Sequence, residues 1–299
     1  MPPSTPVPHV VFDLRDPSQT GIGRVARETV RAYTSLFPED AVTVLREGGR
    51  RYSLRAQREW FQLRRTHQGA TWVWFHWDVP WVGMPFRSVV YVHDLIHLHR
   101  AGFVKRTVAR RWIGHALRHA GAVATGTHAA ASLLPRQATV IPHGVNLTFP
   151  HPWTGDGAYL LTVGEPRPYK NFALVETLAR QLGLPWKHAW RVSDAELATL
   201  YAGARAVLVP SREEGFGLPV LEAFAAGAPV VASDIPPIRE VSGGLATLLH
   251  PDDHEGWRRA ITAVWASPGS AAPRLARAAQ FTWESSARQL RALLVSVSA

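Results

Sequence analysis

The chain has 299 residues, of which 46% are hydrophobic and 19% are charged, and this excludes a disordered protein and allows two domains of about 150 residues each. The absence of cysteine excludes disulfides, cysteine-ligated zinc and a thiol nucleophile. The net charge of +10 is unevenly spread, because residues 1–150 hold 19 Lys and Arg against 9 Asp and Glu, whereas residues 151–299 hold 14 of each.

The first half of the sequence alternates short apolar runs with amphipathic stretches. These patterns predict strands at residues 10–12, 42–45, 71–77, 89–92, 123–125 and 139–141, a glycine turn at 20–23 that leads into a helix through residue 37, and a helix over 104–119. This order is typical of a parallel, doubly wound α/β sheet. Prolines and glycines at 150–157 mark the end of an N-terminal domain, which we place at residues 1–152.

The second half repeats this alternation. It predicts strands at 159–163, 206–209, 229–232 and 246–249, helices at 172–182, 193–201, 219–227 and 237–243, and two further helices in the remainder. Asn171 is expected to cap the helix at 172, and Ser193-Asp-Ala-Glu196 has the spacing of a capping box. We place the second domain at 153–280 and a C-terminal helix at 281–299, which can pack back toward the N-terminal domain.

The segment Glu214-Gly-Phe-Gly-Leu-Pro-Val-Leu-Glu222 joins a predicted strand to a predicted helix. The free N–H groups at a helix start favour an anionic ligand, and Gly215 and Gly217 let the backbone approach a sugar or phosphate closely. Glu222 could accept hydrogen bonds from ribose hydroxyls, and Glu214 from hydroxyls of a transferred sugar. Taken alone, the segment also fits a solvated acidic loop before a helix.

Together with other motifs in the same order, this segment resembles the retaining glycosyltransferases of family 4, the group 1 glycosyltransferases with the GT-B fold. The supporting motifs are Val92-His-Asp94, Ile141-Pro-His-Gly-Val145, Leu161-Thr-Val-Gly164 with Lys170-Asn171, Asp194-Ala-Glu-Leu197, Val230-Val-Ala-Ser-Asp234 and Phe281-Thr-Trp-Glu284. The resemblance implies an α/β protein of two Rossmann-like doubly wound domains facing across a cleft, with the nucleotide-sugar site in the second domain.

The resemblance also implies roles for individual residues. Lys170 matches the family's diphosphate lysine, and Arg167 on the same loop is the candidate for its arginine partner, because the leaving phosphate needs fixed cations. His93 matches a cleft histidine that contacts the transferred sugar. We therefore expect the catalytic residues His93, Glu214, Lys170 and Arg167, and the donor-binding residues Gly21, Gly23, Arg167, Lys170, Gly215, Phe216, Gly217, Leu218 and Glu222.

Other interpretations fit single motifs of the sequence. Gly21-x-Gly23-x-x-Ala26 fits a dinucleotide fingerprint with Glu47 as the ribose acid, but the glycines lie too far beyond the strand at 10–12. His97 and His99 could bind a metal, but no carboxylate cluster accompanies them and the family uses no catalytic metal. His93 with Asp94 also fits a structural loop contact. We expect no cofactor and no metal.

This sequence departs from the family pattern in three places. It has Glu165 and Tyr169 where the family often has arginine, and Asn146 where the family usually has aspartate. Only nine residues separate Gly183 from Ser193, where the family normally has another strand and helix. We therefore expect a trimmed C-terminal sheet and an altered site for the base.

We expect a metal-independent, retaining hexosyltransferase that uses NDP-hexose in polysaccharide or glycolipid assembly. The arginines of the first half, next to Trp60, Phe61 and the Trp-rich run at 72–81, favour an anionic acceptor, lipid-linked or otherwise, and peripheral contact with a membrane. No apolar run reaches the roughly 18 residues of a membrane span, so we expect a cytoplasmic chain at the inner face of the membrane.

Two other functions stay open. A catalytically inactive sugar-nucleotide-binding scaffold fits the trimmed sheet and the loop substitutions. A nucleic-acid-binding protein fits the charge alone, and because no recognised module or dense basic tract accompanies that charge, we expect no nucleic-acid partner.

Overall fold

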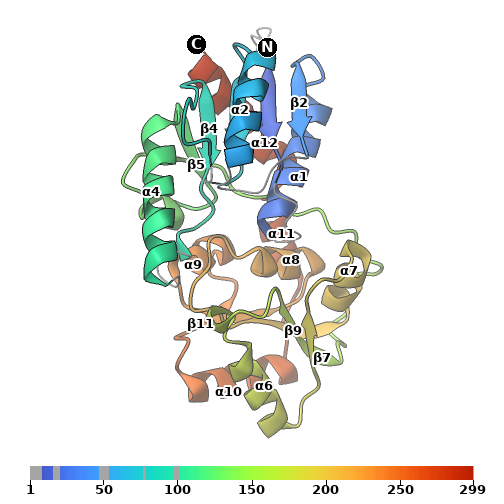
Figure 1. Ribbon diagram of the computed structural model, residues 1–299. Coiled ribbons are helices and arrows are strands. Elements are labelled where there is room, and N and C mark those ends of the chain that lie inside the picture. The colour runs from blue at the N-terminus through green and yellow to red at the C-terminus, as the bar shows by residue number, and fades with distance from the viewer. Residues whose placement is uncertain are drawn as a thin grey trace. The chain divides into compact units, whose positions relative to one another are not determined.

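The computed structural model describes residues 9–15, 21–46, 54–76, 79–96, 98 and 102–298 (Figure 1). The chain forms two compact units: unit 1 comprises Met1–Gly144 and Trp283–Ala299, and unit 2 comprises Val145–Thr282. This division lies before the boundary that the sequence predicts at residue 152. The reason is that Val145, Leu147, Phe149 and Trp153 pack against the core of unit 2.

Unit 1 is built on a six-stranded parallel sheet with the strand order β2-β1-β3-β4-β5-β6. From β1 the chain moves outward to β2 and then returns to β3 on the other side of β1. The connections therefore reverse direction between β1 and β3, and doubly wound sheets bind ligands at such a switch point. The strands are β1 (Val10–Asp13), β2 (Val42–Leu45), β3 (Thr71–Trp74), β4 (Ser88–Tyr91), β5 (Ala122–Thr125) and β6 (Thr139–Val140).

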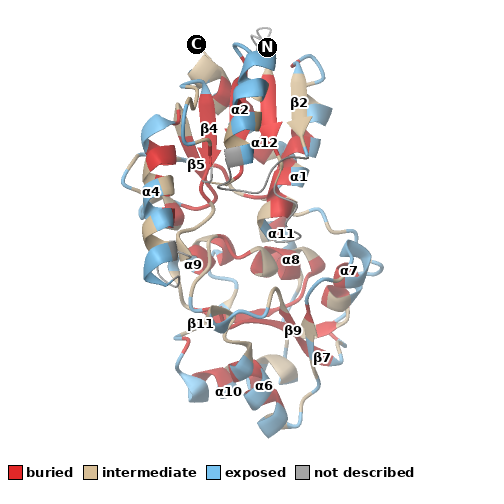
Figure 2. Ribbon diagram, in the orientation of Figure 1, coloured by how far each residue is buried: buried red, intermediate tan, exposed pale blue. Residues whose placement is uncertain are grey.

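Helices cover both faces of this sheet, and strands β1, β3 and β4 are buried between them (Figure 2). Side chains alternate between the two faces of a strand, so Trp72 and Trp74 point to one face and Thr71 to the other. The two indoles pack on Trp60 of α2 in a cluster that includes Ile113 of α4. The helices of unit 1 are α1 (Gly21–Leu36), α2 (Leu54–Thr66), α4 (Phe103–His119), α5 (His128–Ala131) and α12 (Trp283–Ser298).

Helix α12 lies on the opposite face from α2 and α4, where it packs on α1. Thr71 Oγ1 and Ser298 Oγ share a hydrogen bond of 2.7 Å. Arg291 donates to both carboxylate oxygens of Asp40, at 2.8 and 2.9 Å, and the hydroxyl of Tyr33 donates to the same carboxylate at 2.6 Å. The final helix is therefore held in unit 1 by a buried ion pair.

Unit 2 contains a five-stranded parallel sheet with the order β11-β10-β9-β7-β8. The connections reverse direction between β7 and β9, which is the switch point of this sheet. Its strands are β7 (Tyr159–Val163), β8 (Trp186–Ala189), β9 (Ala204–Val209), β10 (Val230–Ser233) and β11 (Thr247–Leu249). Its helices are α6 (Phe172–Leu182), α7 (Asp194–Ala202), α8 (Leu218–Ala226), α9 (Pro236–Ser242), α10 (His254–Ala266) and α11 (Ala272–Ala278).

The two parallel-sheet units confirm the predicted α/β class with two Rossmann-like domains. Several predicted helix ends are also confirmed. Ser193 and Glu196 form the capping box of α7. Helix α8 has Pro219 in its first turn and ends at Gly227, whose φ of 90° is in the left-handed region. These signals are reliable because they act between residues that are close in sequence.

The short connection between Gly183 and Ser193 contains no helix, as the expected trimming requires, but Trp186–Ala189 forms β8, an edge strand parallel to β7 that the sequence does not predict. Three other local predictions are wrong. Asn171 does not cap α6, because its backbone is left-handed and its side-chain amide instead donates to the carbonyl of Pro251. Helix α1 already begins at Gly21, so Gly21 and Gly23 are helical rather than turn residues. Three helices, not two, follow β11.

Candidate active site

Lys170 and Glu214 meet at the switch point of the unit 2 sheet. Lys170 ends a short 3-10 turn (Pro168–Lys170) after β7, and Glu214 lies in the loop after β9. Lys170 Nζ donates to Glu214 Oε1 at 2.7 Å, and the two side chains are 14% and 8% exposed. The carboxyl ends of neighbouring parallel strands lie at one edge of the sheet, where ligands bind. The predicted cationic loop and the first acid of the motif are therefore brought together.

Glu222 lies in the middle of α8, beyond its first turn, and is buried. Its Oε2 accepts a hydrogen bond of 2.7 Å from the hydroxyl of Tyr201 in α7, which is fully buried. A buried carboxylate is tolerated only when it is hydrogen-bonded, so Tyr201 helps to hold its orientation. The sequence does not identify Tyr201 as a site residue. The capping box predicts the helix that contains Tyr201, but no local pattern predicts its hydrogen bond to Glu222.

The glycine loop before α8 presents backbone rather than side chains. Of its two glycines, Gly217 has a left-handed φ of 96°, a conformation that glycine adopts without strain. Phe216 is buried and packs edge-on against Phe281, with ring centroids 6.1 Å apart, and Leu218 packs on the same core. Phe216 can therefore contact a donor mainly through its backbone groups, whereas part of the Leu218 side chain stays accessible.

Arg167 lies on the same loop as Lys170 but forms a local ion pair. Its guanidinium contacts Glu165 at 2.8 Å, and its side chain is 55% exposed. Such an exposed pair adds little stability, so a bound anion could readily draw Arg167 away from it. Glu165 occupies a position where an arginine was expected by resemblance. The donor-binding role of Arg167 stays a prediction.

A pocket of about 170 Å³ lies at the β1/β3 switch point of unit 1. Gly23 of α1 is buried and lines it, whereas Gly21 is exposed at the helix start. Arg27 and Arg46 are exposed at its rim and make it positively charged, which suits an anionic group. The pocket is lined by Asp13, Leu14, Ile22, Gly23, Ala26, Arg27, Arg46, Phe75 and His76.

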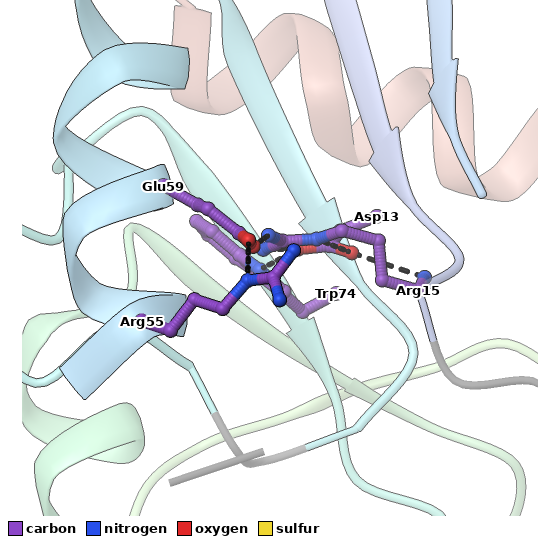
Figure 3. Close-up of polar contacts among 5 residues, drawn as sticks. All are labelled: Asp13, Arg15, Arg55, Glu59 and Trp74. Atoms are coloured by element: carbon purple, nitrogen blue, oxygen red, sulfur yellow. Dashed lines mark hydrogen bonds and ion pairs between the residues drawn. The ribbon is translucent and has the colours of Figure 1, made fainter. Parts of the chain in front are cut away.

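Asp13 at the end of β1 is held by two neighbours (Figure 3). Arg15 donates to its two carboxylate oxygens at 2.6 and 2.9 Å, and the indole N–H of Trp74 donates at 3.0 Å. Burial would raise the pKa of Asp13, but the hydrogen bonds and charge of Arg15 outweigh burial and lower it. Arg15 also lies 3.9 Å from Glu59, which pairs with Arg55. The sequence does not predict this cluster, which fixes one wall of the pocket.

His93 follows β4 and adjoins this pocket through Phe75. Its Nε2–H donates to the Phe75 carbonyl at 2.9 Å, and its ring stacks on Tyr91 with centroids 4.7 Å apart. Burial lowers the pKa of His93 to about 4, and the nearby charge of Asp94 offsets this only in part. Burial also holds the pKa of His143, 5.5 Å away, well below its ordinary value. His93 is therefore neutral near pH 7, and its contact with the transferred sugar stays a prediction.

Within the described ranges, no group of three His, Cys, Asp or Glu side chains is arranged to hold a metal ion. The metal hypothesis depends on His97 and His99, and the dinucleotide hypothesis depends on Glu47. All three residues lie outside the described ranges. The expected absence of metal and cofactor stays a prediction. No helix among the described residues is both long and apolar enough to cross a membrane.

Residues 154–281 match the family described as "Glycosyl transferases group 1". The O-antigen chain mannosyltransferase RfbU of Salmonella typhimurium is 47% identical over 70 residues, which cover 23% of this chain and 20% of that protein. The O-antigen chain mannosyltransferase B of Escherichia coli is 32% identical over 145 residues, which cover 44% of this chain and 36% of that protein. The chain thus spans well under two thirds of the length of these relatives.

Two solved structures share the fold over nearly the whole chain. Sucrose-phosphate synthase from Thermosynechococcus elongatus is 19% identical with a TM-score of 0.76, covering 97% of this chain and 99% of that one. Anabaena HepE, solved in complex with UDP and glucose, is 16% identical with a TM-score of 0.75, covering 96% and 99%. At these identities the likeness concerns the fold, which is the GT-B fold.

Proposed function

We propose that this chain is a group 1 glycosyltransferase, the family that residues 154–281 match, and that it transfers a hexose from a nucleoside-diphosphate sugar to an acceptor hydroxyl, with retention of anomeric configuration. The observation that carries the proposal is the 2.7 Å pair of Lys170 and Glu214 at the unit 2 switch point, with Glu222 buried nearby in α8. Relatives named O-antigen chain mannosyltransferases support a place in polysaccharide or glycolipid assembly.

Lys170 acts on the leaving group. When the bond between the sugar and the diphosphate breaks, negative charge grows on the phosphate, and a fixed ammonium group stabilises that charge. A bound diphosphate competes with Glu214 for the ammonium, which turns a Glu214 oxygen toward the hydroxyls of the sugar. Glu222 accepts hydrogen bonds from the ribose. The acceptor hydroxyl loses its proton to the departing phosphate oxygen as the new bond to the sugar forms.

The acceptor binds in unit 1. The rim formed by Arg27 and Arg46 favours an anionic acceptor, lipid-linked or otherwise. Neutral His93 gives its one N–H to the Phe75 carbonyl, so it can only accept a hydrogen bond, through Nδ1, at the same sheet edge. In this proposal, the side chains of Lys170 and Arg167 neutralise the diphosphate, which in other enzymes is done by a divalent metal. Transfer is therefore expected to continue in excess EDTA. A rate that falls with EDTA and returns with added Mg²⁺ would contradict this part of the proposal.

Donor hydrolysis without acceptor tests the proposal. A thermal-shift screen of UDP, GDP, ADP and their hexoses identifies the donor, because a ligand at 100 times its Kd stabilises the fold by about 2.7 kcal/mol. Lys170→Ala should slow hydrolysis of that donor about 100-fold to 1,000-fold, and Glu222→Ala should weaken nucleotide binding. Arg258→Ala removes an exposed arginine that pairs with Glu255 in α10 and serves as the control with an unchanged rate.

The same experiment separates the enzyme from the scaffold alternative. Nucleotide binding without hydrolysis or transfer, equal in wild type and Lys170→Ala, would favour a sugar-nucleotide-binding scaffold. The absence of any nucleotide-dependent thermal shift would contradict both functions.

A further inference from the structure

Exposed apolar side chains gather on unit 1. Eleven large hydrophobic side chains are exposed among the described residues, and eight of them belong to unit 1. Phe103, Val104 and Val108 on α4 are 75%, 72% and 44% exposed, and Trp81 and Val82 in the loop after β3 are 44% and 51% exposed. Single exposed apolar residues are ordinary, whereas a contiguous patch marks an interaction surface.

The residues on α4 and in the loop form one continuous strip. Val104, Val108 and Trp112 are spaced four residues apart and therefore lie in one row along the helix. Trp81 extends this row, because its ring centroid lies 5.0 Å from that of Trp112. The indole N–H of Trp112 donates to the carbonyl of Val79 at 2.8 Å and ties the loop to the helix. We define the α4 strip as Trp81, Val82, Phe103, Val104 and Val108.

The loop part of the strip is held from two sides. Gln57 of α2 accepts a hydrogen bond from the backbone N–H of Trp81 and donates one to the carbonyl of Val82, both at 3.1 Å. His115 of α4 donates to the carbonyl of Pro80 at 3.0 Å. The exposed side chains are therefore presented by an ordered backbone, which reduces the entropy lost when they bind a surface.

The surroundings of the strip are strongly basic. Helix α4 contains five Lys and Arg and no Asp or Glu, and α2 contains four arginines and a single acid, Glu59, which pairs with Arg55. Arg110 and Arg111 are exposed. By helical spacing, Arg111 borders Val104 and Val108, and Arg110 lies two turns beyond Phe103. Apolar and aromatic side chains bordered by arginines match the boundary between headgroups and acyl chains.

We propose that the α4 strip and its bordering arginines bind the surface of an anionic lipid bilayer. A nucleic acid would explain the arginines but not the exposed Phe103 and the two valines, whereas the boundary between headgroups and acyl chains takes up both kinds of side chain. Helix α4 begins at the carboxyl edge of the unit 1 sheet, the edge that carries the pocket and His93. Binding in this manner brings that edge to the membrane, and it does not depend on which donor the enzyme uses.

Vesicle flotation of the whole chain tests this inference. Wild type should float with vesicles of phosphatidylcholine mixed with phosphatidylglycerol, and much less with phosphatidylcholine alone. Arg110→Ala with Arg111→Ala should lower the partition coefficient about tenfold or more, given the attraction of each arginine to anionic lipid. Phe103→Ser with Val104→Ser should lower it about tenfold through the lost apolar contact. Thermal melting of each variant checks that these exposed substitutions leave the fold intact.

The controls match these changes elsewhere on the surface. Arg258→Ala with Arg259→Ala removes the same charge from exposed sites in unit 2, and Leu133→Ser removes a 64% exposed side chain of unit 1 outside the strip. Both controls should partition like wild type. Equal losses in the controls and the strip variants would overturn the inference, and so would a wild type that does not float. A loss confined to the arginine variant would mean that the chain binds vesicles through charge alone, and it would overturn the role assigned to the apolar side chains of the α4 strip.

Discussion

Glu222 depends on Tyr201 for the hydrogen bond to its Oε2. Tyr201→Phe keeps the buried ring and removes this donor, so the free energy of unfolding should fall by about 1–3 kcal/mol, and the Kd for nucleotide should rise about tenfold. Tyr159→Phe is the matched control, because it loses a hydrogen bond to the Leu200 carbonyl without touching Glu222. Calorimetric titration should show a changed Kd only for Tyr201→Phe, and equal values would contradict its positioning role.

Gly217 adopts a φ that strains any other residue. In Gly217→Ala the new Cβ meets nothing closer than 3.6 Å, so the backbone conformation rather than crowding causes the strain, about 1–2 kcal/mol. Gly183→Ala, at a φ of 64° beyond α6, is equally strained but distant from the glycine loop. Both variants should melt at a lower temperature, and only Gly217→Ala should weaken nucleotide binding. Unchanged nucleotide binding in Gly217→Ala would show that the loop conformation is not needed.

His93 makes the stability of the fold depend on pH. Burial lowers its pKa from 6.5 to about 4, so between these values the unfolded chain binds a proton that the folded chain does not. The stability that neutral His93 provides is complete above pH 6.5 and is lost as the pH falls toward 4. The melting temperature of His93→Gln should therefore fall less between these pH values than that of wild type. Parallel curves would contradict a neutral, buried ring.

Helix α12 is anchored by charge as well as by apolar packing. Arg291 and Asp40 are 7% and 0% exposed, so Arg291→Met leaves a buried carboxylate without its cation and should reduce the free energy of unfolding by about 3–5 kcal/mol. Arg288→Met on the exposed side of the same helix should change it by less than about 0.5 kcal/mol. Denaturant titration measures both. Similar values for the two variants would mean that α12 is held by its apolar residues alone.

Hydrogen exchange over the whole molecule should separate the two binding surfaces. A nucleoside diphosphate should slow exchange at residues 164–171 and 211–222 of unit 2, because these loops contain Lys170, Glu214 and Glu222. Anionic vesicles should slow exchange at residues 79–87 and 103–112 of unit 1. Mass spectrometry of peptides from these segments checks both effects. Protection of the unit 2 loops by vesicles alone would contradict the division of roles between the units.

Local sequence patterns predict the two parallel sheets, most strand and helix positions, and the segments after β7 and β9 that contain Lys170, Glu214 and Glu222. These features depend on interactions between close neighbours: apolar periodicity, the capping box at Ser193, and the glycine that ends α8. The family motif added the expected order of the site residues along the chain. The segment at 54–66, which forms α2, has a weaker pattern and was not predicted.

Contacts between side chains that are far apart in sequence become visible only in the folded chain. Strand β8 contains the polar residues Lys187 and His188 and no continuous apolar run, so it forms because β7 offers a free edge for backbone hydrogen bonds. The partners of Glu222 and Arg291 lie on other elements, as does Trp74, the indole partner of Asp13, and no pattern along the chain predicts these pairs. Such contacts follow from strand order and helix packing, which bring residues together regardless of their separation in sequence.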